Sequence, residues 1–67
     1  MQDGRAEADA YVEELRAALA AHGITLPSLG LDLPGLASRP ARPLITLGAC
    51  NLLTAQALTA ALRQRAA

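Results

Sequence analysis

Hydrophobic positions at the start of the chain repeat at helical spacing. Between residues 5 and 22 they recur every three or four positions and form one stripe, and the acidic residues lie off this stripe. Gly23 is typical of a helix end, because it adopts the left-handed conformation and lets Ile24 contact Leu19. We predict a helix over about residues 5–22, with Asp3 as a candidate N-cap. Its apolar side comprises Ala8, Tyr11, Val12, Leu15, Ala18, Leu19 and His22.

The pattern changes to alternation in the middle of the chain. Residues 24–26 and 45–47 both read Ile-Thr-Leu, with a polar residue between two apolar ones, as in a half-buried strand. The four prolines lie between these two segments, so a long loop without a helix is predicted over residues 27–43. We expect strands over about 24–26 and 44–47 that pair as antiparallel neighbours.

The last third of the chain predicts a second helix, over about residues 51–65. Asn51 is a favourable N-cap, and the alanines and leucines that follow are strong helix formers without a breaker. Apolar or small side chains cover most of its circumference, which is typical of a helix packed on most sides. A short chain has few other elements to cover it. The candidate partner or dimer interface is the side that comprises Leu53, Ala57, Ala60 and Gln64.

Together these elements predict one small α+β domain over residues 1–67. The expected order is helix, strand, loop, strand, helix, with both helices on one face of a two-stranded antiparallel sheet. The alternative is an all-α helical hairpin with an irregular proline-rich linker. A chain of 67 residues buries only about 60% of its unfolded surface on folding, so a lone monomer is marginally stable. We therefore expect a homodimer or a complex with a larger partner.

The charges argue against nucleic acid as a partner. The net charge is zero, with all six acids in residues 1–32 and no lysine in the chain. Four arginines would neutralise at most about four phosphates, and no aromatic platform is available for base stacking. The arginines in the second half are Arg39, Arg42, Arg63 and Arg65.

An uncharged stretch at residues 43–62 has the length of a membrane-spanning helix. Pro43, Gly48 and several polar residues interrupt it, and it lacks an aromatic belt. The first residues are acidic, unlike a signal peptide. We expect a cytoplasmic protein that does not use a membrane as a partner. The alternative is a small membrane-associated peptide through residues 43–62.

Cys50 is the one residue with distinctive chemistry. As the only cysteine it forms no intrachain disulfide, which favours a reducing compartment. It precedes a predicted helix start, where the dipole favours a thiolate, but a buried cysteine in the core is the other interpretation. His22 is the only histidine and the candidate base for a dyad, although no third group that would orient it is evident. A thiol-based redox or metal sensor using Cys50 is therefore an alternative function.

No enzymatic site is predicted. Glu13 and Glu14 are adjacent and point about 100° apart, so they do not form a catalytic pair. The glycines do not match a phosphate-binding loop, and one cysteine with one histidine is too few ligands for zinc. We expect a non-enzymatic protein with no catalytic residue, no metal and no cofactor.

Two segments carry a resemblance to a known group of proteins. Residues 23–30 read GITLPSLG and are followed by Asp32, and residues 43–51 read PLITLGACN. Together with the two helices, these segments resemble small actinobacterial proteins of the Streptomyces type, which are often encoded beside helix–turn–helix regulators. The resemblance covers about residues 11–63. It implies a regulatory, protein-binding role and supplies no catalytic residue.

Overall fold

The fold is seen in a computed structural model that describes residues 4–66. The two strands are antiparallel, with Gly30 opposite Thr46 and Leu31 opposite Ile45. Helices and a sheet together make this a small α+β domain, and the sheet distinguishes it from the all-α hairpin. Within the described residues the elements are α1 (Arg5–Ala20), β1 (Gly30–Leu31), α2 (Leu33–Ala37), β2 (Ile45–Thr46) and α3 (Leu52–Ala66).

The end of α1 forms the predicted Schellman motif. The Ile24 N–H donates to the carbonyl oxygen of Leu19 at 2.9 Å. Gly23 has a φ of 71° and donates to the carbonyl oxygen of Ala20 at 2.9 Å. The helix ends at Ala20 rather than at residue 22, because the last turn tightens and the His22 N–H donates to Leu19 at 2.9 Å. The predicted contact of Ile24 with Leu19 is confirmed, since both belong to one buried cluster.

The predicted strand at residues 24–26 is wrong. Ile24 is only 3% exposed, but the chain turns just beyond it, where the Leu29 N–H donates to the Leu26 carbonyl at 3.2 Å. The segment that pairs is β1, which begins only after this turn. Strand pairing depends on which segments meet in space, and a local repeat does not carry that information. The second predicted strand, at about 44–47, is confirmed as β2.

The predicted loop at residues 27–43 contains β1 and the short helix α2, so the expectation of no helix there is wrong. The Asp32 carboxylate caps α2 by accepting a hydrogen bond from the Gly35 N–H at 2.9 Å. Pro34 lies in the first turn, where the amide hydrogen that proline lacks is not needed. The Gly35 carbonyl then accepts from the Arg42 N–H at 2.7 Å, which holds the returning chain against α2.

The core lies between α1 and the sheet and is small. The middle of the apolar side of α1 is buried, whereas Tyr11, Ala18 and His22 at its edge are exposed. Partly buried residues from both strands and from α3 surround the buried ones. The buried hydrophobic residues of the described chain are Ala8, Val12, Leu19, Ile24 and Leu29.

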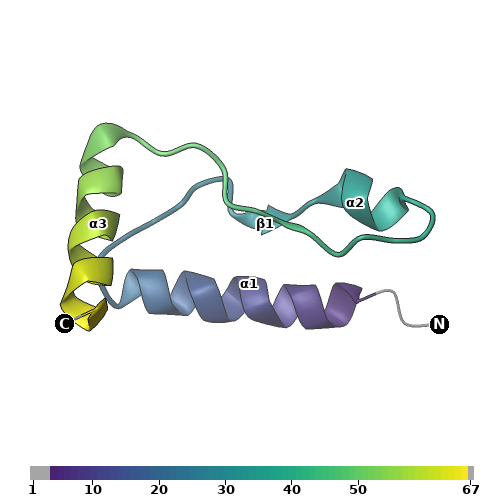
Figure 1. The fold of residues 1–67 in the computed structure, drawn as a ribbon, viewed down its shortest axis with the longest axis horizontal. Coiled ribbons are helices and arrows are strands. Elements are labelled where there is room, and N and C mark those ends of the chain that lie inside the picture. The colour runs from purple at the N-terminus through teal and green to yellow at the C-terminus, as the bar shows by residue number, and fades with distance from the viewer. Residues whose placement is uncertain (1–3, 67) are drawn as a thin grey trace.

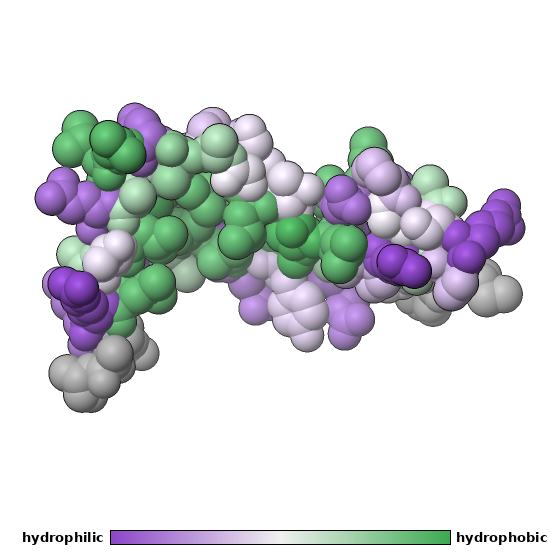
Figure 2. Space-filling view, turned by 45° about the horizontal axis from the view of Figure 1, so that its top comes forward, coloured by the Kyte–Doolittle hydropathy of each residue, from purple (hydrophilic) through white to green (hydrophobic). Residues whose placement is uncertain are grey.

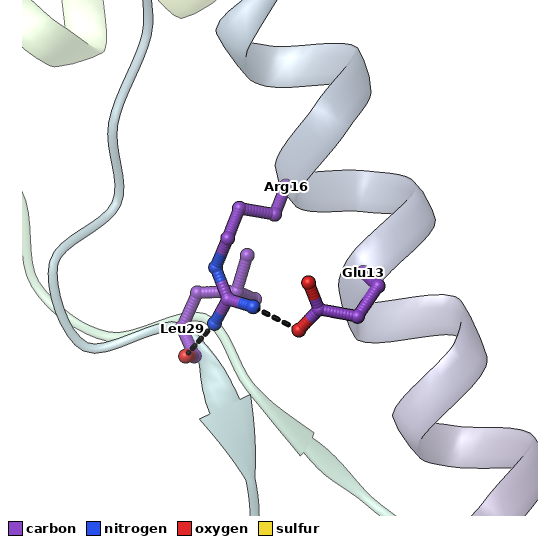
Figure 3. Close-up of polar contacts among 3 residues, drawn as sticks. All are labelled: Glu13, Arg16 and Leu29. Carbon is purple, nitrogen blue, oxygen red and sulfur yellow. Dashed lines mark hydrogen bonds and ion pairs between the residues drawn. The ribbon is translucent and has the colours of Figure 1, made fainter.

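A polar contact joins α1 to the start of the sheet. The guanidinium of Arg16 donates through Nη2 to the carbonyl oxygen of Leu29 at 2.9 Å, and through Nη1 it pairs with the carboxylate of Glu13 (Figure 3). Leu29 directly precedes β1, so this hydrogen bond holds the strand against α1. The Arg16 and Glu13 side chains are about half and two thirds exposed, and such an ion pair adds little stability by itself.

The helix α3 stands apart from the rest of the fold. Asn51 caps it as predicted, since its Oδ1 accepts from the Thr54 N–H at 2.8 Å, and the helix bounds agree with the predicted 51–65. α3 lies across the C-terminal end of α1, so that the ribbon has the outline of an L (Figure 1). α1 packs against β1, whereas α3 reaches the core cluster with Leu58 and Ala61. The predicted placement of both helices on one sheet face is therefore not confirmed.

The chain is extended for its length. Its radius of gyration is 13.8 Å, whereas a compact domain of this length has about 11 Å. Its accessible surface is 5273 Å², whereas a compact monomer of 6.9 kDa exposes about 4,000 Å². Each chain thus exposes roughly 1,300 Å² more than a compact fold of the same mass.

Candidate functional site

The predicted interface residues lie on one side of α3, here called the α3 flank and made of Leu53, Ala57, Ala60 and Gln64. At 100° per residue the α3 flank points about 100° away from the side that carries Leu58 and Ala61. The contact with the core therefore leaves the α3 flank uncovered, and its four residues are exposed. The rest of the chain therefore leaves the predicted interface uncovered. That a partner binds there stays a prediction.

The α3 flank combines one large apolar side chain with a small-residue centre. Leu53 is 76% exposed and lies in the first turn of the helix, directly after the Asn51 cap. Ala57 and Ala60 would let a second backbone approach to about 8 Å, the lower end of helix-to-helix distances. This side of α3 suits a second helix, because Leu53 offers apolar surface and the two alanines at the centre allow a close approach.

Apolar side chains are exposed well beyond the α3 flank. Figure 2 shows apolar residues from α3 to the middle of the molecule, with hydrophilic residues at the opposite end and also along the outer edge of the α3 end. Singly exposed leucines are normal, but large contiguous apolar surface on a small protein indicates an interaction site. Within residues 4–66, the large hydrophobic residues that expose more than half of their surface are Tyr11, Leu33, Leu44, Leu47, Leu52, Leu53 and Leu62.

A groove between α1 and α3 was not predicted. It has a volume of about 370 Å³ and is apolar apart from His22. The sequence places Leu58 and Leu62 near each other on the second helix, but it does not show that this side faces α1. Ala18 and His22, at the edge of the apolar side predicted for the first helix, are the sequence signal for this second apolar surface. The groove is lined by Leu15, Ala18, Leu19, His22, Leu58, Ala61 and Leu62.

Cys50 is exposed, so the interpretation as a core cysteine is wrong. It directly precedes the Asn51 cap of α3, as predicted. With Thr25, Pro27 and neighbouring residues it lines a second hollow of about 370 Å³, whose lining contains no basic side chain. His22 lines the groove between α1 and α3 instead, so the structure does not bring the two residues of the predicted dyad to one site.

The candidate metal ligands and the arginines do not gather at one place in the described residues. Within residues 4–66, no three histidine, cysteine or acidic side chains gather in a position to hold a metal ion. Arg39 and Arg42 follow α2, whereas Arg63 is on α3, and Figure 1 places these two elements at opposite ends of the fold. These arginines therefore do not form one basic patch.

The uncharged stretch at residues 43–62 is not one continuous helix. β2, an irregular segment and the greater part of α3 divide it. In the part of the chain that the structure describes, no helix has both the length and the apolar character to cross a bilayer.

Comparison with known proteins gives no match to a family model, a curated protein or a solved structure. The resemblance to small actinobacterial proteins therefore stays a prediction.

Proposed function

We propose that this chain is a non-enzymatic protein-interaction module that binds another polypeptide through the α3 flank. The observation that carries the proposal is the exposure of Leu53, at 76%, on a helix that reaches the core cluster with Leu58 and Ala61. Burial of apolar surface stabilises a complex by about 25 cal/mol per Å². The surplus surface of roughly 1,300 Å² per chain exceeds the about 800 Å² per partner of a standard interface.

The proposed role is regulatory and cytoplasmic. The resemblance to proteins encoded beside helix–turn–helix regulators supports the role, and a single cysteine agrees with a reducing compartment. The partner is a second copy of the chain or a larger regulatory protein. The proposal assigns no catalytic residue, metal or cofactor, and neither nucleic acid nor a membrane is the proposed partner.

Light scattering across a dilution series, with circular dichroism in parallel, tests this proposal. We expect the purified chain either to associate with itself or to lose helix on dilution, because its own core leaves α3 poorly supported. A monomer that stays fully folded at every concentration would overturn the proposal, since the chain would then support α3 without a partner.

Substitutions on the α3 flank locate the surface. Leu53→Glu and Ala57→Arg each introduce a charge where the partner would pack, so we expect both to abolish association. Leu33→Glu is the matched control, because Leu33 is 62% exposed but lies on α2 at the other end of the fold. If all three variants associate as the native chain does, the α3 flank is not the interface.

A thiol-based sensor is the second candidate function, and the exposure of Cys50 favours it. An exposed thiol at a helix start is accessible to oxidants and metal ions. The rate of alkylation as a function of pH, followed by intact mass, tests this function. A thiol that reacts fast at neutral pH supports the sensor, and one that reacts like free cysteine argues against it.

A further inference from the structure

We infer that the occupant of the α3 flank is a second copy of this chain, with the two α3 helices packed antiparallel about a two-fold axis. The inference rests on the proposed function and names its partner and its geometry. Three observations carry it: the spacing of the exposed residues on α3, the distribution of charge, and the surface that each chain leaves uncovered.

The spacing of the α3 flank is the same in both directions. Its positions follow one another at intervals of four, three and four residues. When two such helices run antiparallel, with the axis midway between Ala57 and Ala60, Ala57 meets the partner's Ala60. At the same register Leu53 meets Gln64 of the partner subunit. Every contact then occurs twice, as an isologous interface requires.

The side chains at these positions fit this register. The two alanine pairs lie next to the axis and let the helices approach to about 8 Å. Leu53 lies at each end of the contact, where it covers the aliphatic part of the partner's Gln64. The amide of Gln64 stays at the rim, in water, so the pair buries apolar surface without burying an unpaired polar group.

Charge selects the antiparallel orientation over the parallel one. α3 has no acidic residue, and Arg63 is exposed near its C-terminal end. A parallel pair would place both copies of Arg63 at the same end of the dimer with no carboxylate on either helix, whereas an antiparallel pair places them at opposite ends. Antiparallel helix dipoles attract each other as well. The net charge of zero adds no general repulsion between two copies.

The surface that the whole chain leaves uncovered exceeds what a standard interface takes. Each chain exposes roughly 1,300 Å² more than a compact monomer, and a standard interface takes about 800 Å² from each partner. Each dimer buries two copies of Leu53, and the burial of one leucine corresponds to about a tenfold change in affinity or more. We therefore expect Leu53→Ala to weaken the dimer by roughly a hundredfold.

Disulfide trapping in the full chain tests the register. In a Cys50→Ser background, an Ala57→Cys chain labelled with ¹⁵N is mixed with an unlabelled Ala60→Cys chain in a glutathione redox buffer. The antiparallel register brings cysteines 57 and 60 of different copies within the Cα distance that a disulfide spans, about 4.4–6.8 Å. We expect the mixed-mass disulfide dimer to form faster than either dimer of a single mass.

Gln56→Cys and Thr59→Cys, mixed in the same way, are the matched control. They have the same three-residue separation and are exposed, but they lie on a different side of α3. We expect no preference for the mixed disulfide in this pair.

The outcomes separate this inference from the proposed function. Fast mixed disulfides between positions 57 and 60, together with a dimer by light scattering, support the inference. Same-mass disulfides that dominate would overturn the antiparallel register in favour of a parallel one. A dimer with no trapping at these positions, or a monomer that is poorly folded alone, would overturn the inference and leave the proposed function intact. A stable folded monomer would overturn both.

Discussion

Replacement of Gly35 by alanine gives a direct test of how α2 and the returning chain fit together. A Cβ atom at this position would lie 2.4 Å from the carbonyl oxygen of Arg42 and 2.7 Å from Oδ2 of Asp32. Both distances are below 3.0 Å, a separation that real Cβ contacts essentially never fall below. The nearer atom belongs to the backbone, so α2 and the returning chain must move apart by more than half an ångström.

The expected loss of stability follows from the contacts that this movement breaks. The hydrogen bond from Arg42 to the Gly35 carbonyl and the cap from Gly35 to Asp32 each contribute about 1 kcal/mol. Steric strain adds about 1 kcal/mol or more. Alanine is favoured over glycine in a helix by up to about 1 kcal/mol, which offsets part of this. We expect Gly35→Ala to lower the free energy of unfolding by about 2 kcal/mol.

Gly30→Ala is the matched control for this experiment. No atom lies within 4 Å of a Cβ built at Gly30, and its φ is not positive. The same chemical change should therefore stabilise the chain slightly, by about 0.4–1 kcal/mol, because it restricts the unfolded state.

Urea denaturation followed by circular dichroism measures both glycine variants. All samples are held at one protein concentration, since association would otherwise shift the midpoint. A Gly35→Ala chain as stable as the native one, or more stable, would refute the close packing of α2 against the returning chain.

Three further predictions concern the core, a helix cap and a polar contact. Leu19→Ala should lower the free energy of unfolding by about 3 kcal/mol, because Leu19 is 7% exposed in the core cluster. Leu33→Ala, at an exposed position, should change it by less than about 0.5 kcal/mol, and thermal melts that fail to separate these two variants would contradict the core. Asn51→Ala should destabilise α3 by about 1 kcal/mol whereas Asn51→Asp keeps the cap, so equal helix content by circular dichroism in both variants would disprove the cap. Arg16→Met keeps the aliphatic stem but removes the donor to Leu29, and hydrogen exchange around β1 should become faster; unchanged protection would mean that the contact does not hold the strand.

Features that depend on a few neighbouring residues could be predicted from the sequence. Gly23 after a helical pattern specified the end of α1, and Asn51 before an alanine- and leucine-rich run specified the start of α3. Both motifs are local, because the atoms that form each hydrogen bond belong to residues within five positions of one another. Helical spacing also grouped Leu53, Ala57 and Ala60 on one side of α3, although it did not show which side faces the core.

Features that depend on distant residues could not be predicted in the same way. The strand that pairs with β2 is β1 rather than residues 24–26, because the turn before Leu29 decides which segment reaches β2.

The helix α2 was not predicted, for a different reason. Pro34 was interpreted as a helix breaker, although Asp32 two residues earlier is a cap that makes proline acceptable in the first turn. The groove between α1 and α3 needs the angle between two helices, which the spacing within each helix does not contain.

The weak attachment of α3 has a consequence for how long the protein survives in a cell. An isolated helix of 15 residues is marginal in water, and Leu52 and Leu53 at its start gain little from the rest of the fold. An unpaired copy should therefore open at α3 often, and it would present unfolded backbone and apolar leucines to proteases. A bound copy would be protected. Copies that are too dilute to pair would then be removed by turnover, without a dedicated degradation signal.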